Sequence, residues 1–209
     1  MITRLCLVRH GETLWNAERR IQGQIDIGLN QHGLRQARAA GEYLRDEGAT
    51  ALYSSDLARA WATAHALAEA TGLKAQPMPE LRERKYGIFE GLTYDQARQE
   101  YPEVYAHFEA RQPELAFPGG GESLHDLSVR VVAALQEVVA RHRGETVLLV
   151  THGGVLDVVN RFARGLPLDT PRDFAIPNAG LNWLSLAGDC WSVEDWALTA
   201  HLERALDEL

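Results

Sequence analysis

Two histidines, each placed at the end of an apolar segment, are the side chains of this sequence best suited to act together. Residues 5–8 form an apolar run followed at once by Arg9 and His10, and residues 147–150 form a second run followed shortly by His152. Each run is typical of a buried strand, and the glycine after each histidine lets the backbone turn or a ligand come close. Because ligands bind at the carboxyl ends of strands in α/β sheets, the two imidazoles would converge if the strands are neighbours. The simpler alternative is that each histidine caps its strand.

An arginine beside two histidines favours an anionic ligand, above all a phosphoryl group. A metal site would need a third ligand and little positive charge nearby, and no Cys pair or His-x-x-x-His spacing predicts zinc. A serine triad is not predicted either, because no Gly-x-Ser-x-Gly segment occurs. Arg59, expected in the first turn of a helix that follows a strand, would add a second cation, unless it is an ordinary exposed helix residue.

Acidic and basic residues crowd together with glycines between Glu80 and Gly91. One of these glutamates could donate a proton to a leaving group. The alternative is a solvated run of charges, and the residues alone leave both interpretations open.

The composition is that of one globular domain. The chain has 209 residues, a formal net charge of −8 and 45% hydrophobic residues. The negative charge disfavours nucleic acid or an anionic membrane as a partner. No run approaches the about 18 apolar residues of a membrane span, and no signal peptide is recognised. Cys6 and Cys190 are expected to be free thiols of a cytoplasmic protein.

Apolar periodicity predicts strands that alternate with helices. Strands are predicted at residues 5–8, 51–54, 73–78, 147–150, 180–187 and 190–196. Helices are predicted at residues 33–46, 57–70, 94–100, 103–111, 123–142 and 155–164, with a short helical turn in 13–20. This order implies an α/β fold, a three-layer α/β/α sandwich with a mainly parallel central sheet and helices on both faces. We expect a single domain over 1–209, in which a mostly helical insertion at about 92–121 forms a lid.

Residue types also predict where several helices begin and end. The expected N-caps are Asn30, Ser123 and either Ser55 or Asp56, and the expected C-caps are Gly48 and Gly72. The charged tail, residues 199–209, is expected to be mobile.

Five segments in order resemble the signature of the histidine phosphatase superfamily, also called the phosphoglycerate mutase-like family. The first is Leu-Val-Arg-His-Gly-Glu-Thr at 7–13, with Asn16 and Gln22-Gly23 after it. The second and third are Ser-Asp-Leu-x-Arg-Ala-x-x-Thr-Ala at 55–64 and Leu-x-Glu-x-x-x-Gly-x-x-Glu-Gly at 81–91. Gly-Gly-Glu-Ser at 120–123 and Thr-His-Gly-Gly at 151–154 complete the set. Together they span about three quarters of the chain, which makes the match highly specific.

The resemblance implies a role for each matching residue. His10 would be the nucleophile that is transiently phosphorylated, and Glu83 would be the general acid and base. The phosphoryl oxygens would be held by Arg9, Arg59 and His152, with Asn16 and Gln22 as lesser contacts and Tyr86 as a further substrate contact. Neighbouring arginines disfavour a third positive charge, so they should keep His10 neutral and nucleophilic. No metal or cofactor is implied, because the arginines supply the positive charge.

The same family contains hydrolases and cofactor-dependent mutases. Family mutases hold a phosphoglycerate carboxylate with extra basic residues in a longer middle segment. Here Tyr94 stands where mutases usually carry a lysine, and the segment 101–121 contains a single arginine, Arg111. The sequence therefore favours a phosphatase of small phosphorylated metabolites, with a phosphoglycerate mutase as the alternative. A catalytically inactive phosphoester-binding protein is less favoured, because every implied catalytic residue is present. The paired C-terminal strands offer an edge for a possible homodimer.

Overall fold

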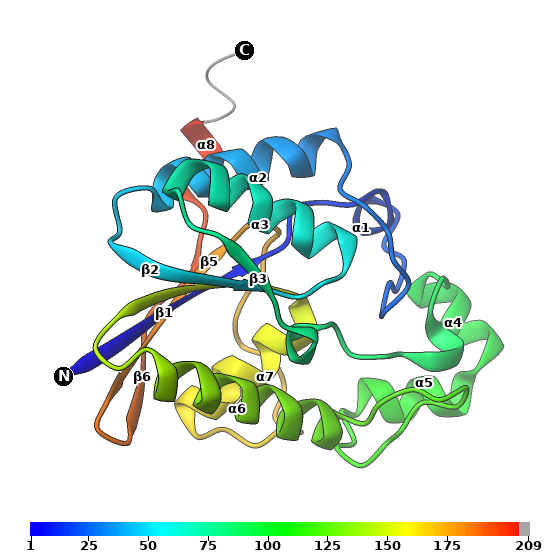
Figure 1. The fold of residues 1–209 in the computed structure, drawn as a ribbon. Coiled ribbons are helices and arrows are strands. Elements are labelled where there is room, and N and C mark those ends of the chain that lie inside the picture. Colours follow the sequence, from blue (N-terminus) through cyan, green and yellow to red (C-terminus); the bar gives the residue numbers. More distant parts are fainter. Residues whose placement is uncertain (205–209) are drawn as a thin grey trace.

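A six-stranded sheet in the order β3-β2-β4-β1-β5-β6 forms the centre of the computed structural model, which describes residues 1–204 (Figure 1). The strands are β1 (Ile2–Arg9), β2 (Ala49–Ser54), β3 (Ala75–Pro77), β4 (Thr146–Thr151), β5 (Leu181–Ala187) and β6 (Cys190–Leu198). The pairings from β3 through β2 and β4 to β1 are parallel, whereas β5 runs antiparallel to both of its neighbours. The predicted mainly parallel sheet is confirmed.

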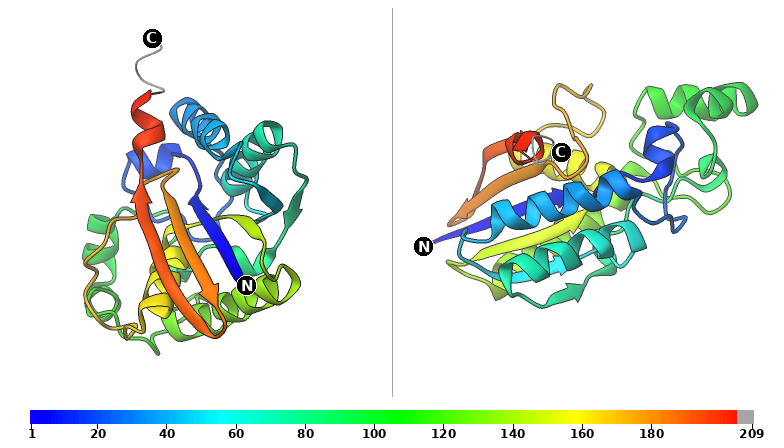
Figure 2. Two further views of the ribbon diagram at one scale, coloured as in Figure 1. Left: turned by 90° about the vertical axis from the view of Figure 1, so that its left-hand side faces the viewer. Right: turned by 90° about the horizontal axis from the view of Figure 1, so that it is seen from above.

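Helices cover both faces of the sheet, as predicted (Figures 1 and 2). One face carries α2 (Gln31–Leu44) and α3 (Ala58–Thr71), and the other carries α6 (Leu124–Arg141) and α7 (Gly153–Arg164). Strand β1 shows why both faces are covered. Its Leu5 and Leu7 pack on the α6–α7 side, while Cys6 and Val8 pack on the α2–α3 side, and all four are fully buried. Such a strand reads as continuously apolar because it has no solvent face.

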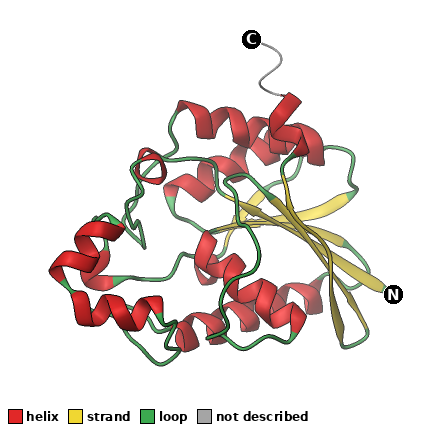
Figure 3. Cartoon of the chain, turned by 180° about the vertical axis from the view of Figure 1, so that it is seen from behind, coloured by secondary structure: helices red, strands yellow, loops and turns green. Residues whose placement is uncertain are grey.

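The segment between residues 92 and 121 lies beyond the carboxyl ends of the parallel strands (Figures 1 and 3). It contains α4 (Tyr94–Glu100) and α5 (Pro102–Glu109), and it has an apolar cluster of its own. This cluster is centred on the ring of Phe89, which packs on the rings of Tyr105 and Phe117 at centroid distances of 6.1 and 5.0 Å. Two short 3₁₀ turns, Pro79–Leu81 and Gly87–Phe89, carry the chain from β3 to this segment. The segment is therefore placed to cover whatever lies at the strand ends.

Some predicted helix ends are wrong. Neither Ser55 nor Asp56 caps α3, whose N-cap is Leu57 without a side-chain bond. The Asp56 carboxylate is taken up by Arg82 instead, and Ala58 N–H donates to Asp26. Helix α2 ends at Leu44, four residues before Gly48. The predicted N-caps Asn30 and Ser123 and the C-cap Gly72 are confirmed.

The chain end also differs from the prediction. Helix α8 (Ala200–Arg204) follows β6 and lies beside α2 (Figure 1). Its His201 is buried and bonds through Nε2 to the carbonyl of Ala179, which holds this part of the tail in place. The remainder of the tail lies outside the described residues. Near the start of the chain, α1 (Leu14–Ala17) confirms the short helical turn predicted after the first strand.

Candidate active site

The two histidines of the strand ends meet because β1 and β4 are parallel neighbours. Arg9 pairs in register with Thr151, so His10 and His152 leave the sheet side by side. Their ring centroids lie 5.1 Å apart with the planes inclined at 57°, and both side chains are buried. The backbone N–H of His10 also donates to the carbonyl of Thr151 at 2.9 Å. The sequence predicted that the two imidazoles converge if the two strands are neighbours. The sheet order confirms that they are neighbours.

The ring of His10 is fixed by the turn that follows it. Its Nδ1 lies 2.7 Å from the carbonyl oxygen of Gly11. Since a carbonyl only accepts, Nδ1 carries the hydrogen, and Nε2 keeps a lone pair. Gly11 allows this turn because a Cβ there would lie 2.4 Å from the carbonyl oxygen of Gly33. The amide of Asn178 donates to the carbonyl of His10 at 3.1 Å and holds the same turn from the other side.

Both imidazoles are neutral in the fold. Burial, reinforced by the positive charges of Arg59 and Arg9, holds the pKa of His10 well below its ordinary value of about 6.5. Burial and then the charge of Arg59 lower the pKa of His152 in the same way. A neutral imidazole with a free Nε2 is the nucleophilic form of histidine. Burial, reinforced by arginine charge, thus favours the protonation state that phosphoryl attack requires.

Arg59 is buried and Arg9 is half-buried, and both are held by backbone carbonyls. Arg9 donates to Ile176, and Arg59 donates to Ile25 and Gly23 at 3.0 and 2.6 Å. Arg59 lies in the first turn of α3 and is only 1% exposed, so it is not an ordinary exposed helix residue. Within residues 1–204, four buried polar atoms near the histidines have no hydrogen-bond partner, namely Arg9 Nε, Arg59 Nε, His152 Nδ1 and Gln22 Oε1. Buried donors and acceptors without partners are costly, which indicates that a polar ligand or water completes this site.

Ser55 and Asn178 are among the site residues that were not predicted from the sequence. Ser55 places its hydroxyl 2.8 Å from His152 Nε2, and it also accepts from the backbone N–H of Leu57. Asn178 bonds to the carbonyl of His10 and to the side-chain oxygen of Asn16, through which Asn16 joins the site. Ser55 opens the second signature segment, which was the available signal. Asn178 lies in an irregular loop, where no pattern marked it.

Glu83 reaches the strand ends from the loop after the first 3₁₀ turn. Its two carboxylate oxygens accept from Gly154 N–H at 3.0 and 3.1 Å, and one of them accepts from Arg84 N–H at 2.8 Å. A Cβ on Gly154 would lie 2.3 Å from this carboxylate, so the position requires glycine. The side chain is 9% exposed. Glu83 is therefore part of the site and not of a solvated charge run.

The backbone of Glu83 is clamped as well. Arg130 on α6 donates to the carbonyls of Glu80 and Glu83 at 2.7 and 3.1 Å and forms a bidentate pair with Glu122. Gln24 donates to the same carbonyl of Glu83 at 3.0 Å. This network connects the third and fourth signature segments and fixes the position of the Glu83 carboxylate.

Comparison with known proteins agrees with this geometry. Residues 5–199 match the model of the histidine phosphatase superfamily, branch 1. The chain belongs to the histidine phosphatase superfamily. A metal-independent phosphoserine phosphatase of Arabidopsis thaliana is 40% identical over 203 residues, which cover 96% of this chain and 84% of the relative. A probable phosphoglycerate mutase GpmB of Yersinia pestis is 38% identical, with 97% of each chain covered.

Solved structures share the fold over nearly the whole length. A mycobacterial glucosyl-3-phosphoglycerate phosphatase, solved with VO3, superposes with a TM-score of 0.85 and is 33% identical. The match covers 94% of this chain and 99% of that one. The names of these relatives include both phosphatases and mutases. Family membership therefore indicates a reaction at phosphorus but does not identify the substrate.

In this histidine phosphatase, a cavity of about 240 Å³ opens next to Gly154, whose backbone N–H donates to Glu83. Gly154, Tyr86 and Tyr94 are among its lining residues. A Cβ on Gly154 would lie 3.5 Å from the Tyr86 hydroxyl, which places Tyr86 at the boundary between the carboxylate and the cavity. Of the aromatic residues between 92 and 121, Phe108 lines the cavity and also packs against the apolar cluster to which Tyr105 and Phe117 belong.

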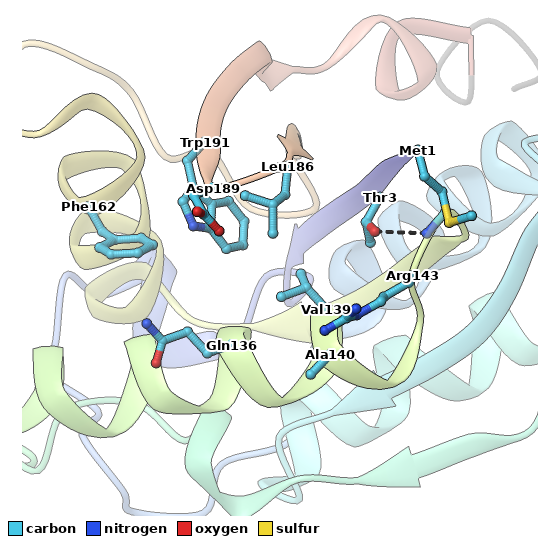
Figure 4. A pocket seen from close by; sticks show the side chains of 12 residues that line it. Met1, Thr3, Gln136, Val139, Ala140, Arg143, Phe162, Leu186, Asp189 and Trp191 are labelled. Carbon is cyan, nitrogen blue, oxygen red and sulfur yellow. Dashed lines mark hydrogen bonds between the residues drawn. The ribbon is translucent and has the colours of Figure 1, made fainter.

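A larger hollow of about 860 Å³ lies at the amino ends of β1 and β4, opposite the strand ends that carry the histidines (Figure 4). Its lining includes Met1 and Thr3 at the amino end of β1, Phe162, and Trp191 at the start of β6. In Figure 4 the Thr3 hydroxyl accepts from Gly144 N–H just before β4. Since this hollow is at the amino ends of β1 and β4, it does not communicate with His10 through the strand ends.

The buried neutral histidines make stability depend on pH. The unfolded chain binds protons on these imidazoles below about pH 6.5, whereas His10 and His152 stay neutral in the fold to a lower pH. The unfolded state therefore binds more protons, and the free energy of unfolding should fall as the pH drops below about 6.5, by at most ~1.4 kcal/mol per pH unit for each histidine. Denaturant unfolding between about pH 7.5 and 5.5 measures the slope.

The matched control is an exposed histidine. His152→Gln should flatten the slope, and His65→Gln, on the exposed face of α3, should keep the wild-type slope. An equal slope in all three proteins would contradict burial of the neutral His152 imidazole.

Proposed function

We propose that this chain hydrolyses small alkyl phosphomonoesters through a phosphohistidine at His10 Nε2. The observation that carries the proposal is the free lone pair of a neutral, buried imidazole that lies beside two arginines. The Arabidopsis and mycobacterial relatives, both named as phosphatases, support the same reaction.

In the first step, His10 Nε2 attacks phosphorus and the bond from phosphorus to the leaving oxygen breaks. Glu83 gives its proton to that oxygen, so the product leaves as an alcohol. Arg9 and Arg59 donate to the equatorial oxygens, where charge accumulates in the transition state. In the second step, Glu83 accepts a proton from water, the water oxygen bonds to phosphorus, and the phosphorus–nitrogen bond to His10 breaks.

His152 would act as a hydrogen-bond donor to the phosphoryl group. The Ser55 hydroxyl oxygen accepts from Leu57 N–H, so its own hydrogen is available to His152 Nε2. That bond leaves the hydrogen of the imidazole on Nδ1, the atom without a protein partner among residues 1–204. Asn16 and Gln22 would complete the contacts to the phosphoryl oxygens.

Phosphate release in the presence of a chelator tests the proposal. Wild-type protein should release phosphate from phosphoserine and from other alkyl phosphates in EDTA at the rate seen without it, because arginines supply the positive charge. Within residues 1–204, no three His, Cys, Asp or Glu side chains gather in a way that could hold a metal ion. Loss of activity in EDTA that Mg²⁺ or Zn²⁺ restores would overturn the mechanism, and no release from any ester would favour a binding protein.

The mutase alternative has a separate test. Phosphoglycerate mutase chemistry is favoured by the relative named GpmB and opposed by Tyr94, which lines the cavity where family mutases usually present a lysine. We expect 3-phosphoglycerate to release phosphate and not to be isomerised efficiently, with or without 2,3-bisphosphoglycerate. An enolase-coupled assay that reports turnovers of about 10 per second or faster, typical of a dedicated enzyme, would establish the mutase instead.

The location, partner and oligomeric state of the enzyme are also proposals. Within residues 1–204, no helix has the length and apolar character needed to cross a bilayer. We propose a cytoplasmic location, supported by the free thiols of Cys6 and Cys190. A small phosphorylated metabolite is the proposed partner, with no role for nucleic acid or membranes. A homodimer through β6 stays a prediction, supported by the position of β6 at the edge of the sheet.

A further inference from the structure

The backbone turn that follows His10 lies directly against the first turns of α2. A Cβ on Gly33 would lie 2.1 Å from the carbonyl oxygen of Glu12 and 2.6 Å from its nitrogen, so this close approach requires glycine. Asn30, the N-cap of α2, donates through its side chain to the Glu12 carboxylate at 2.7 Å. Asn30, Gly33 and Gln36 are three residues apart, so they lie on one face of the helix. This face of α2 is therefore built around the residues that follow the nucleophile.

Gln36 bonds to the peptide group that holds the His10 ring. The carbonyl oxygen of the peptide between Gly11 and Glu12 accepts from His10 Nδ1 at 2.7 Å. The N–H of the same peptide donates to Gln36 Oε1 at 2.9 Å. The imidazole, the peptide and the side-chain amide thus form a chain of two hydrogen bonds. Bonds arranged in such a chain polarise and strengthen one another.

The orientation of this peptide decides which nitrogen of His10 carries the hydrogen. If the peptide turned over, its N–H would face Nδ1 and the hydrogen would move to Nε2, the atom that must attack phosphorus. Gly11 gives the backbone the freedom to turn in this way. Thr63 on α3 holds the peptide before Gly11, because its hydroxyl accepts from Gly11 N–H at 3.1 Å. Gln36 holds the peptide after Gly11, and this second peptide carries the carbonyl.

The acceptor matters most while the bond to phosphorus forms. The Nε2 lone pair of His10 makes the new bond, and the electron pair of the breaking bond goes to the leaving oxygen, which takes the Glu83 proton. Nδ1 keeps its hydrogen, so the ring of the phosphohistidine carries a positive charge. A hydrogen bond from a charged donor is stronger than one between neutral groups. The carbonyl that Gln36 orients therefore stabilises the transition state more than the ground state.

We propose that Gln36 is a positioning residue for the nucleophile. It orients the Gly11–Glu12 peptide so that His10 keeps a free Nε2 and has an acceptor for the charge that develops on its ring. Gln36 acts through the backbone and lies outside the five signature segments. The inference rests on the proposed phosphatase function and adds a residue to its machinery.

Gln36→Met tests the role, because it removes the acceptor and keeps the length of the side chain. Phosphorylation of His10 by saturating phosphoserine, measured by rapid quench, should slow about tenfold, the effect of losing one hydrogen bond to a group that becomes charged. The phosphoserine concentration for half-maximal rate should change by less than about twofold, because the interaction strengthens only in the transition state. Gln36→Glu, whose carboxylate can accept from the same N–H, should recover most of the lost rate. Gln31→Met, at an exposed position of α2, is the matched control and should behave as wild type.

Nitrogen NMR of His10 separates positioning from a merely structural role. At pH 7.5 the wild-type Nε2 signal should be that of a nitrogen with a lone pair, and the Nδ1 signal that of an N–H nitrogen. In Gln36→Met both signals should move toward each other as the second tautomer becomes populated. The spectrum of His10→Ala assigns the signals. Gln36→Ala serves the same comparison if the methionine variant does not fold, because alanine is the most favourable helix residue.

An unchanged tautomer or an unchanged phosphorylation rate in the variant without the acceptor would overturn the positioning role. Because the NMR measurement needs no turnover, it also separates this failure from failure of the phosphatase proposal. If wild type released no phosphate and the His10 signals still moved in Gln36→Met, the proposed function would fail and the positioning role would stand.

Discussion

Replacing His10 with alanine should lower phosphate release by roughly 10⁴–10⁶, the range seen when a covalent nucleophile is removed. The reason is geometric. His10 presents an Nε2 lone pair, because its Nδ1 hydrogen is taken by Gly11. The neighbouring imidazole of His152 is engaged through Nε2 with Ser55 and cannot replace it. Steady-state release of phosphate from phosphoserine, measured for wild type and variant, gives the ratio.

A trapping experiment identifies the residue that carries the phosphoryl group. Wild type quenched during turnover of a labelled phosphoester should carry an acid-labile phosphoryl group, and His10→Ala should carry none. His152→Ala keeps the nucleophile, so it should still become labelled, at a lower rate. His65→Ala, on the exposed face of α3, should behave as wild type. Normal turnover of His10→Ala, or label that persists in it, would contradict the assignment.

The strand ends could be predicted from the sequence because the pattern there is local. An uninterrupted apolar run stops at Arg9, and another stops at Thr151, so both strands and their polar ends are visible in a few residues. That the two ends meet depends on β4 entering the sheet between β2 and β1. No local pattern encodes this order, so the residues alone predict that the histidines meet only if the two strands are neighbours, and the family resemblance implies that they are.

The residues that the sequence missed act through contacts between distant segments. Gln36 bonds to Glu12 N–H from within α2, 24 residues along the chain. Arg130 looks like an ordinary helix residue until its bonds to the Glu83 loop are known. Neither has a periodicity or a spacing that marks it.

The wrong helix cap at α3 has an instructive cause. Ser55 is a residue type that favours N-caps, yet its hydroxyl lies against His152, and the cap falls at Leu57. A local preference was overridden where the site needed the side chain. Departures from local rules of this kind are expected at functional sites.

Glu83→Gln should slow the first step for alkyl phosphates by about 10²–10⁴, the usual effect of a positioned proton donor. An alkoxide is a poor leaving group and needs a proton as its bond to phosphorus breaks. A glutamine keeps the size of the side chain, and its amide oxygen can still accept from Gly154 N–H. The variant therefore removes the proton and little else. Rapid-quench measurement of His10 phosphorylation by phosphoserine isolates this step.

An aryl phosphate supplies the discriminating comparison. Nitrophenolate leaves well without a proton, so phosphorylation of His10 by nitrophenyl phosphate should be slowed far less in Glu83→Gln. Dephosphorylation still needs a base for water, so the phosphoenzyme should accumulate and nitrophenol should appear in a burst. Glu80→Gln, in the adjacent 3₁₀ turn where the side chain is exposed, is the matched control and should leave both esters unaffected. Equal slowing of alkyl and aryl esters in the first step would mean that Glu83 holds the site together without transferring the proton.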